Sequence, residues 1–368
     1  MRLLEEGSVI RGTYEVERFL GEGGFAEVYR VKHRFLGRQA MKVFKTPSIT
    51  LDEAHRMLGE AILLSRIGHP NIVRVFDADL VGTSYGECAY FTMEHVAGGT
   101  LEDFWKSYGA ASVPVETSVE LLRQVCRGLA VAHSYTPPIV HRDIKPQNIL
   151  VGYDTGGLRA RISDFGLAKH VNPLTLLLSA QGTRRFKAPE VFRNPQADSC
   201  AGDVWALGCV LYLLVTDRLP YEGVPGWELE MPDFTARDLV PPSRLNYRVD
   251  IELDRILCQA LAIEPTRRHA SAQRLLVDLE AWHPPERSPI APSGTADSPN
   301  LGKSALGPLR DADEAGAQRL ADEAIRLTRF PGKLNEAADL MEDAFKKSPA
   351  LRDRYEYQIQ LWRKGVVM

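Results

Sequence analysis

The sequence lacks the features that mark several classes of protein. Its five cysteines contain no C-x-x-C pair, so neither a zinc site nor a disulfide framework is indicated. No apolar run approaches the roughly 18 residues that a membrane span needs. The formal net charge of −3 gives no reason to expect a nucleic acid or an anionic membrane as partner. These absences favour a protein of the reducing cytoplasm.

The size and composition leave room for more than one domain. With 368 residues, 44% of them apolar and 25% charged, the chain can bury a sizeable core. After Trp282 the composition shifts to Pro, Ser, Gly and Ala, which is typical of a stiff linker with little to bury. We therefore expect a folded region over residues 14–282, a linker over 283–310 and a separate tail over 311–368.

A glycine-rich turn dominates the start of the folded region. From Tyr14 polar and apolar residues alternate up to Gly-Glu-Gly-Gly-Phe-Ala at 21–26, and a strand-like pattern resumes at Glu27, which predicts a hairpin. The missing side chains let backbone N–H groups approach phosphate oxygens. Alone the signal is weak, because most glycine-rich hairpins are ordinary turns.

Three further segments have clear periodicity. Residues 39–44, Gln-Ala-Met-Lys-Val-Phe, read as an apolar strand interrupted by Lys42, which without the preceding turn would be a solvated lysine on an edge strand. Residues 52–67 have helical spacing and an acidic first turn. Residues 117–134 carry an i, i+4 apolar stripe that predicts a core helix.

The strongest signal is His-Arg-Asp-Ile-Lys-Pro-Gln-Asn at 141–148, followed by Asp-Phe-Gly at 164–166. The two stretches put an acid, a cation and two oxygen-bearing metal ligands on adjacent loops, which is the equipment that phosphoryl transfer between oxygens needs. Either stretch alone could be ordinary turn chemistry, since Asp, Asn and Gly favour turns. Their order and their flanking patterns favour a catalytic role.

In these stretches the chain resembles the eukaryotic-type (Hanks-type) Ser/Thr protein kinases. The resemblance implies an α+β fold of two lobes. A small antiparallel β lobe with a regulatory helix spans residues 14–96, and a larger helical lobe spans residues 97–282. The implied activity is transfer of the γ-phosphate of ATP, with Mg²⁺, to Ser and Thr hydroxyls of protein substrates.

The same resemblance assigns the residues that react. Asp143 accepts the proton of the attacking hydroxyl, and Lys145 beside it marks the Ser/Thr branch of the family. Asn148 and Asp164 hold Mg²⁺, while Lys42 contacts the α and β phosphates of ATP.

The resemblance also implies a nucleotide site in the small lobe. Glu60 is expected to form an ion pair with Lys42, with Glu53 as the alternative. Ala26 replaces the third glycine of the family's turn, and its methyl group is small enough to leave phosphate cover in place. The nucleotide-binding candidates of this region are Gly21, Glu22, Gly23, Gly24, Phe25, Ala26, Val28, Ala40, Lys42 and Glu60.

The link between the lobes completes the nucleotide site by resemblance. Met93 guards the back of the pocket, and Glu94 and Val96 offer backbone groups to adenine. Thr100 is expected near the ribose. It also fits the N-cap of a helix, and the two interpretations are compatible.

The activation segment is expected to run from Asp164 to Ala-Pro-Glu at 188–190. Thr183 resembles the family threonine whose hydroxyl helps to hold the catalytic Asp and Lys. A buried Glu190 needs a cation, which Arg268 supplies by resemblance. Asp203 is expected to brace the backbone of the catalytic loop.

Two hydroxyls in this segment are phosphorylation candidates. Thr175 and Ser179 are the only Ser or Thr residues between Asp164 and Gly182. A phosphate on either would neutralise Arg142, the arginine directly before the catalytic aspartate. Alternatively, the leucines at 176–178 hold the loop in an active form without modification.

The tail reads as two amphipathic helices, residues 313–328 and 334–347, and resembles a single tetratricopeptide-type repeat. One such repeat cannot form a stable array. A helical hairpin packed on the rest of the chain or on another copy is the alternative, and a protein partner bound through the tail is a third use.

Two rival functions share part of this equipment. A pseudokinase scaffold would bind nucleotide and partners without catalysis, but Lys42, Asp143, Asn148 and Asp164 are all present. A small-molecule phosphotransferase would share the ATP machinery. Thr183, the Ala-Pro-Glu stretch and Arg268 favour a protein substrate instead.

Overall fold

The computed structural model describes residues 2–24, 26–47, 52–53, 59, 62–63, 65–66, 68–108, 112–154, 157–165, 184–194, 196–221, 234, 238–284, 307–328, 333–348, 351, 355, 358–359 and 362. The chain forms two compact units, Met1–Pro284 and Pro285–Met368.

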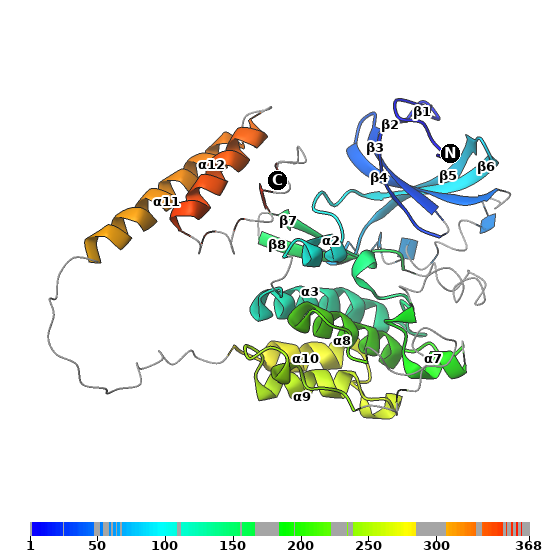
Figure 1. The fold of residues 1–368 in the computed structure, drawn as a ribbon. Coiled ribbons are helices and arrows are strands. Elements are labelled where there is room, and N and C mark those ends of the chain that lie inside the picture. Colours follow the sequence, from blue (N-terminus) through cyan, green and yellow to red (C-terminus); the bar gives the residue numbers. More distant parts are fainter. Residues whose placement is uncertain are drawn as a thin grey trace, which may run out of the picture. The chain divides into compact units, whose positions relative to one another are not determined.

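The first unit begins with a six-stranded antiparallel sheet in the order β1-β2-β3-β4-β6-β5 (Figure 1). The hairpin around the glycine turn and the strand containing Lys42 are confirmed. The described residues within 52–67 are helical, as expected. The strands are β1 (Val9–Ile10), β2 (Tyr14–Glu22), β3 (Ala26–His33), β4 (Gly37–Pro47), β5 (Val75–Thr83) and β6 (Gly86–Glu94).

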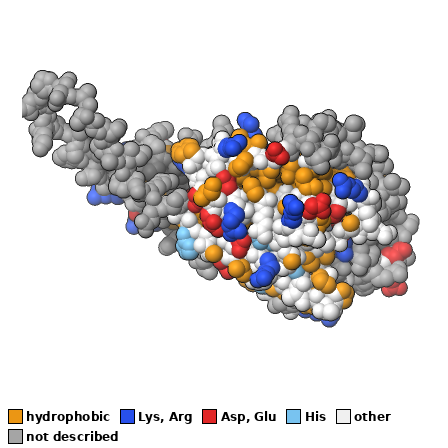
Figure 2. Space-filling view, turned by 90° about the horizontal axis from the view of Figure 1, so that it is seen from below, with side chains coloured by type: hydrophobic (Ala, Val, Ile, Leu, Met, Phe, Trp, Pro, Cys, Tyr) orange, Lys and Arg blue, Asp and Glu red, His pale blue; other side chains and the backbone are white. Residues whose placement is uncertain are grey.

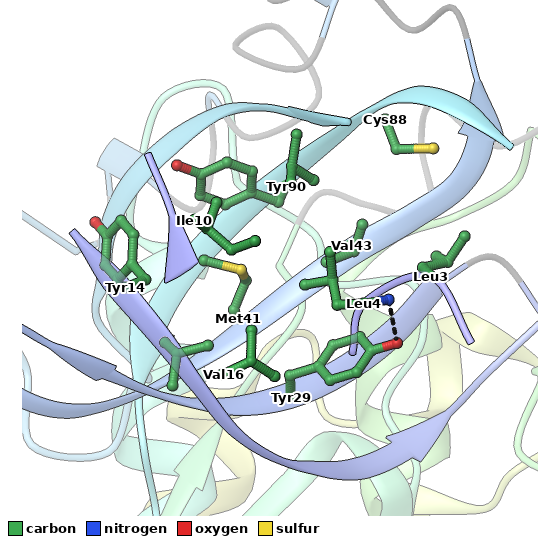
Figure 3. Close-up of a cluster of buried hydrophobic side chains, with 12 residues drawn as sticks. Leu3, Leu4, Ile10, Tyr14, Val16, Tyr29, Met41, Val43, Cys88 and Tyr90 are labelled. Atoms are coloured by element: carbon green, nitrogen blue, oxygen red, sulfur yellow. Dashed lines mark hydrogen bonds between the residues drawn. The ribbon is translucent and has the colours of Figure 1, made fainter. Parts of the chain in front are cut away.

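The two faces of this sheet bury different side chains, because successive residues of a strand point to opposite faces. Tyr29 and Met41 belong to the cluster drawn in Figure 3. Ala26 and Ala40, on the alternate positions of the same two strands, belong to a second cluster. Lys42 shares the alternation of Ala40 and pairs with Asp164, so this second face is the one turned toward Asp164.

The larger lobe of the first unit is helical. Helix α3 begins at Val115 rather than at the predicted residue 117, with Pro114 at its N-cap, where a proline's missing N–H costs nothing. The described helices of this lobe are α2 (Leu101–Lys106), α3 (Val115–His133), α7 (Pro189–Arg193), α8 (Cys200–Thr216), α9 (Ile251–Ala260) and α10 (Ala272–Ala281). Three short 3-10 turns, η1 (Pro146–Asn148), η2 (Pro242–Arg244) and η3 (Pro265–Arg267), and the hairpin β7 (Ile149–Asp154) and β8 (Gly157–Ile162) complete its described elements.

A glycine sets how closely the two lobes approach. A Cβ atom on Gly128 of α3 would lie 2.8 Å from the carbonyl oxygen of Asn71, which is closer than a real Cβ contact allows. Asn71 in turn joins β8, since the N–H of Ile162 donates to its carbonyl at 2.9 Å. The segment between the regulatory helix and β5 is therefore fixed against the catalytic lobe.

The second unit contains α11 (Gly307–Leu327) and α12 (Leu334–Lys347), and its core is made of its own residues. Six alanines are completely buried, so the helices pack closely: Ala317, Ala321, Ala324, Ala337, Ala338 and Ala344. The predicted linker, residues 283–310, extends past Gly307, where α11 begins. The sequence pattern assigns Pro308 to the linker, but this residue lies in the first helical turn, where proline is tolerated.

No helix among the described residues is long and apolar enough to cross a membrane. Figure 2 shows apolar side chains interspersed with charges of both signs on the face seen from below.

Candidate active site

The catalytic loop is fastened to the core through its backbone. Asp203, in the first turn of α8, accepts hydrogen bonds from the N–H groups of His141 at 2.7 Å and Arg142 at 2.9 Å. His133 Nε2 lies 3.0 Å from the same carboxylate. Burial alone would raise the pKa of Asp203, but the bonds and charge it receives, foremost from His133, hold that pKa below its ordinary value. The bracing role expected of Asp203 is present.

The peptide before the catalytic aspartate is held from a second side. Arg142 has a φ of 69°, the left-handed region that non-glycine residues rarely adopt. Lys187 Nζ donates to the carbonyl oxygen of Arg142 at 2.5 Å, and Arg142 Nε lies 3.7 Å from Asp198 Oδ2. These contacts, with Asp203, stabilise a strained backbone directly before Asp143.

The carboxylate of Asp143 is held through one of its two oxygens, Oδ2. Lys145 Nζ lies 2.8 Å from its Oδ2, and Asn148 Nδ2 donates to the same oxygen at 2.9 Å and to the Asp143 carbonyl at 2.8 Å. Among the described residues these contacts to the carboxylate are made to Oδ2, so Oδ1 is the oxygen that can accept a proton from an acceptor hydroxyl. The sequence-predicted base, cation and amide are brought together around one carboxylate.

Lys42 from the small lobe meets Asp164 from the large lobe. Their Nζ and Oδ2 atoms lie 2.7 Å apart. Burial would raise the pKa of Asp164, but the nearby Lys42 charge and hydrogen bond outweigh that effect and lower it. Asp164 also has a left-handed backbone, with a φ of 65°. The predicted nucleotide lysine and metal ligand thus form a direct ion pair.

The residues present fit a Mg²⁺ site. Asp164 Oδ1 is a buried oxygen with no hydrogen-bond partner in the part of the chain that the structure describes, and a buried carboxylate oxygen normally has one. Asn148 uses its amide nitrogen on Asp143, so its amide oxygen is the atom that can ligate a cation. Ser163 fixes the spacing of the two ligands, because its N–H and its hydroxyl donate to the Asn148 carbonyl at 2.9 and 3.0 Å.

Two ligands leave most of a magnesium coordination shell to other oxygens. Mg²⁺ is usually bound by one or two carboxylates together with water and substrate phosphates. Within the described ranges no group of three His, Cys, Asp or Glu residues could hold a metal ion. The donor set suits a cation that arrives with a nucleotide.

The sheet register assembles the nucleotide candidates of the small lobe. Val28 lies opposite both Gly21 on β2 and Lys42 on β4, and Ala40 lies opposite Met93 on β6. Met93 is 7% exposed at the end of a buried strand. These residues therefore line one region of the sheet, next to the ion pair of Lys42.

The link between the lobes, residues 94–100, is held by backbone and side-chain bonds. The N–H of Glu94 donates to the carbonyl of Arg74 at 2.8 Å, and the Glu94 carboxylate pairs with Arg161 at 3.1 Å. Thr100 is the N-cap of α2 and shares a capping box with Asp103. The capping interpretation is confirmed, while the roles of Glu94, Val96 and Thr100 toward a nucleotide stay predictions.

The expected ion pair between Glu190 and Arg268 forms with two parallel bonds. Arg268 donates to the Glu190 oxygens at 2.8 and 2.7 Å, and its side chain is fully buried. Its guanidinium also lies 4.9 Å from the ring centre of Trp205 on α8. The end of the activation segment is thereby joined to the core of the helical lobe.

The protein kinase domain model matches residues 14–279 of the chain. The chain belongs to the protein kinase family. It is similar to the serine/threonine-protein kinases PknB of Mycolicibacterium smegmatis, at 32% identity over 83% of this chain and 48% of that protein, and of Mycobacterium leprae, at 32% over 74% and 44%. It therefore spans less than half the length of each of these relatives.

A solved structure shows the same kinase fold. The crystal structure of a point mutant of the Mycobacterium tuberculosis PknI kinase domain matches 76% of this chain and 98% of its own with a TM-score of 0.55. The sequence identity is 24%. The two-lobed α+β architecture expected from the sequence is thus confirmed.

Five predicted site residues of the kinase lie outside the described residues. They are Phe25, Glu60, Thr175, Ser179 and Thr183. Conversely, the sequence did not point to Lys187, because this lysine closely follows Arg184 and Arg185 and does not stand out as a single charge. Sequence reasoning also placed the domain start at residue 14 and missed residues 2–10, whose Leu3, Leu4 and Ile10 are buried in the small lobe.

Proposed function

We propose that the chain is a Ser/Thr protein kinase that transfers the γ-phosphate of Mg-ATP to Ser and Thr hydroxyls of proteins. The observation that carries the proposal is the joint geometry of Asp143 and Asp164. One carboxylate is oriented by Lys145 and Asn148, and the other is paired with Lys42 at 2.7 Å. A pseudokinase would need no such arrangement.

The residues of the chain supply positioning and proton transfer. Bound Mg-ATP would supply the phosphoryl group and neutralise its charge. Asp143 Oδ1 orients the acceptor hydroxyl and takes its proton, while Lys145 on Oδ2 balances the charge of the carboxylate. Lys42 orients the nucleotide phosphates from the small lobe. The strained backbone at Arg142 keeps the base in place before substrate arrives.

The activity is tested by incubating purified protein with γ-labelled ATP and three acceptors: a Ser peptide, the same peptide with Tyr, and an aminoglycoside. Label on the Ser peptide alone supports the proposal. Label on the aminoglycoside alone would support a small-molecule phosphotransferase, and binding of ATP without transfer to any acceptor would support a pseudokinase.

We further propose autophosphorylation in the activation segment. Replacing both candidate hydroxyls, Thr175→Ala with Ser179→Ala, is expected to lower kcat about tenfold, because a charge-assisted hydrogen bond from Arg142 to phosphate contributes about 1.5 kcal/mol or more. Phosphopeptide mass spectrometry detects the phosphorylated residues, and initial rates measure kcat. Phosphatase treatment of the unaltered chain should reproduce the loss.

Full activity of that double variant would reject the switch. Asp198 would then be the anion to examine, since it already lies 3.7 Å from Arg142. The assignment of kinase activity does not depend on this outcome.

We propose that the tail is a tetratricopeptide-like segment that binds a protein partner. Its own alanine-rich helical core supports this proposal.

We propose a cytoplasmic location, which the five free cysteine thiols support.

A shortened chain that ends at Pro284 is expected to fold and to bind MgATP within about twofold of the full chain, because units joined by a linker fold separately. Calorimetric titration with MgATP measures it. The control ends at Val277 and so removes the carbonyls of Leu279 and Trp282 that Arg123 binds, and it should fail to fold. If the chain ending at Pro284 aggregated, and restoring residues 310–368 gave a folded protein, the prediction would be wrong.

A further inference from the structure

Residues 2–8, hereafter the strap, lie against the hairpin that carries the glycine turn. Leu3 and Leu4 are 6% and 4% exposed and enter the core cluster of the small lobe with Tyr29 and Val43 (Figure 3). Burial of these two leucines removes apolar surface from water and so contributes toward holding the segment in place. The strap is therefore part of the small lobe.

The strap is also hydrogen-bonded to β3. The N–H of Leu3 donates to Glu27 Oε2 at 2.9 Å. The N–H of Leu4 donates to the hydroxyl of Tyr29 at 3.0 Å (Figure 3). That hydroxyl in turn donates to Glu27 Oε2. Burial raises the pKa of Tyr29 to about 12, so the hydroxyl keeps its proton and remains a donor.

Further bonds join the strap to β2, the other strand of the hairpin. Glu6 Oε1 accepts from the N–H of Phe19 at 3.1 Å. The N–H of Gly7 donates to the carbonyl of Val16 at 2.8 Å, and the N–H of Val16 donates to the carbonyl of Ser8 at 2.9 Å. Both strands that lead into the glycine turn are thus held by one segment.

Glu27 stands where these bonds can affect the nucleotide turn. It directly follows Ala26, the residue that replaces the third glycine, and lies opposite Glu22 at the end of the hairpin. Its neighbour Val28 lies opposite Lys42. Because alternate residues face opposite sides of a strand, Glu27 and the strap act from one face while Val28 and Lys42 serve the other.

Glu27 carries a carboxylate at a buried position of the strand. It is 5% exposed, and a carboxylate is almost never buried to that degree unless it is hydrogen-bonded. Both bonds that the structure shows are made to its Oε2 by the strap backbone and by Tyr29. Its buried carboxylate is thus used to join the strap to the tip of the hairpin.

We propose that Glu27 is a positioning residue, which through the strap fixes the glycine turn at the height at which its backbone covers the phosphates of MgATP. The proposal rests on the kinase function proposed above. Loosening the strap would let the turn move away from the phosphates and would weaken nucleotide binding, while Asp143 and the acceptor side of the site would be unaffected.

The test compares variants of the full chain by KM for MgATP, by kcat and by direct calorimetric titration with MgATP. Glu27→Ala removes the acceptor for both bonds and is expected to raise KM and Kd for MgATP about tenfold, with kcat changed less than about threefold. Glu27→Gln keeps an amide oxygen that can accept both bonds, so it should stay within about twofold of the unaltered chain.

Tyr29→Phe provides a second route if Glu27→Ala fails to fold, because it keeps the buried ring and removes only the hydroxyl bonded to Leu4 and Glu27. It should raise KM for MgATP in the same direction. The matched control is Glu15→Ala, an exposed glutamate on β2 of the same hairpin, which should leave KM unchanged.

An unchanged Kd for MgATP in folded Glu27→Ala and Tyr29→Phe would overturn the proposal while leaving the kinase assignment intact. A fall in kcat with KM unchanged would also overturn it, because that pattern belongs to the catalytic loop. If the unaltered chain bound MgATP without transferring phosphate, the kinase function would fail, yet the Kd comparison would still decide the role of Glu27.

Discussion

Replacing Asp143 with Asn is expected to lower kcat on a protein acceptor by about a thousandfold or more while the fold survives. Asn has nearly the same shape, so the neighbours Lys145 and Asn148 keep a polar partner. The amide cannot accept the proton of the hydroxyl, and general-base catalysis alone contributes about a hundredfold to ten-thousandfold. Initial rates with labelled ATP, with circular dichroism for folding, measure the effect.

Lys42→Met belongs to the same prediction, because it leaves Asp164 without the cation at 2.7 Å and removes the phosphate contact. The control is Asp154→Asn, an exposed aspartate bonded to Arg159 at 2.7 Å on β7. Near-normal turnover of Asp143→Asn would show that the base is assigned to the wrong residue.

Arg268→Met is expected to lower the free energy of unfolding by about 3 to 5 kcal/mol. The variant leaves the Glu190 carboxylate, with 17% of its side chain exposed, without its two charged bonds, and breaking a buried ion pair from one side costs this much. Urea unfolding followed by tryptophan fluorescence measures it, because Trp205 lies under the arginine.

The comparison variant is Arg255→Met. Arg255 pairs with Glu252 at 2.8 Å, but about half of each side chain is exposed, and such pairs contribute about 0 to 1 kcal/mol. The double variant Arg268→Met with Glu190→Gln should recover part of the loss, since no charge then stays unpaired. Equal stability of Arg268→Met and Arg255→Met would mean that the pair does not hold the activation segment.

The parts of the site that the sequence predicted are those carried by short continuous stretches. Asp143, Lys145 and Asn148 stand within six residues of one another, so their meeting follows from a single loop. The strand with Lys42 follows from a short apolar run interrupted by one lysine, a pattern that depends only on neighbouring residues. The pair of Glu190 and Arg268 needed the family resemblance, because nothing local links residues 78 positions apart.

The contacts that the sequence did not predict join a side chain to a distant backbone group. Lys187 reaches the carbonyl of Arg142, and Glu27 accepts from the N–H of Leu3. Backbone groups are the same at every position, so no pattern of residue types marks the partner. Leu3 and Leu4 are also too few to show a period. Only the folded chain shows where these bonds are made.

The anchor at Asp203 has a consequence for how such a loop can change over evolutionary time. It binds the N–H groups of His141 and Arg142, not their side chains. The two bonds of the anchor therefore do not depend on which side chains stand at these positions, although the His141 ring also holds the loop by accepting the N–H of Asp143 at 3.2 Å. Asp203 itself cannot be replaced without losing both bonds. A descendant of this chain could lose its chemistry by a single substitution at Asp143 and keep the same loop path, so that its backbone would still look like that of a working enzyme.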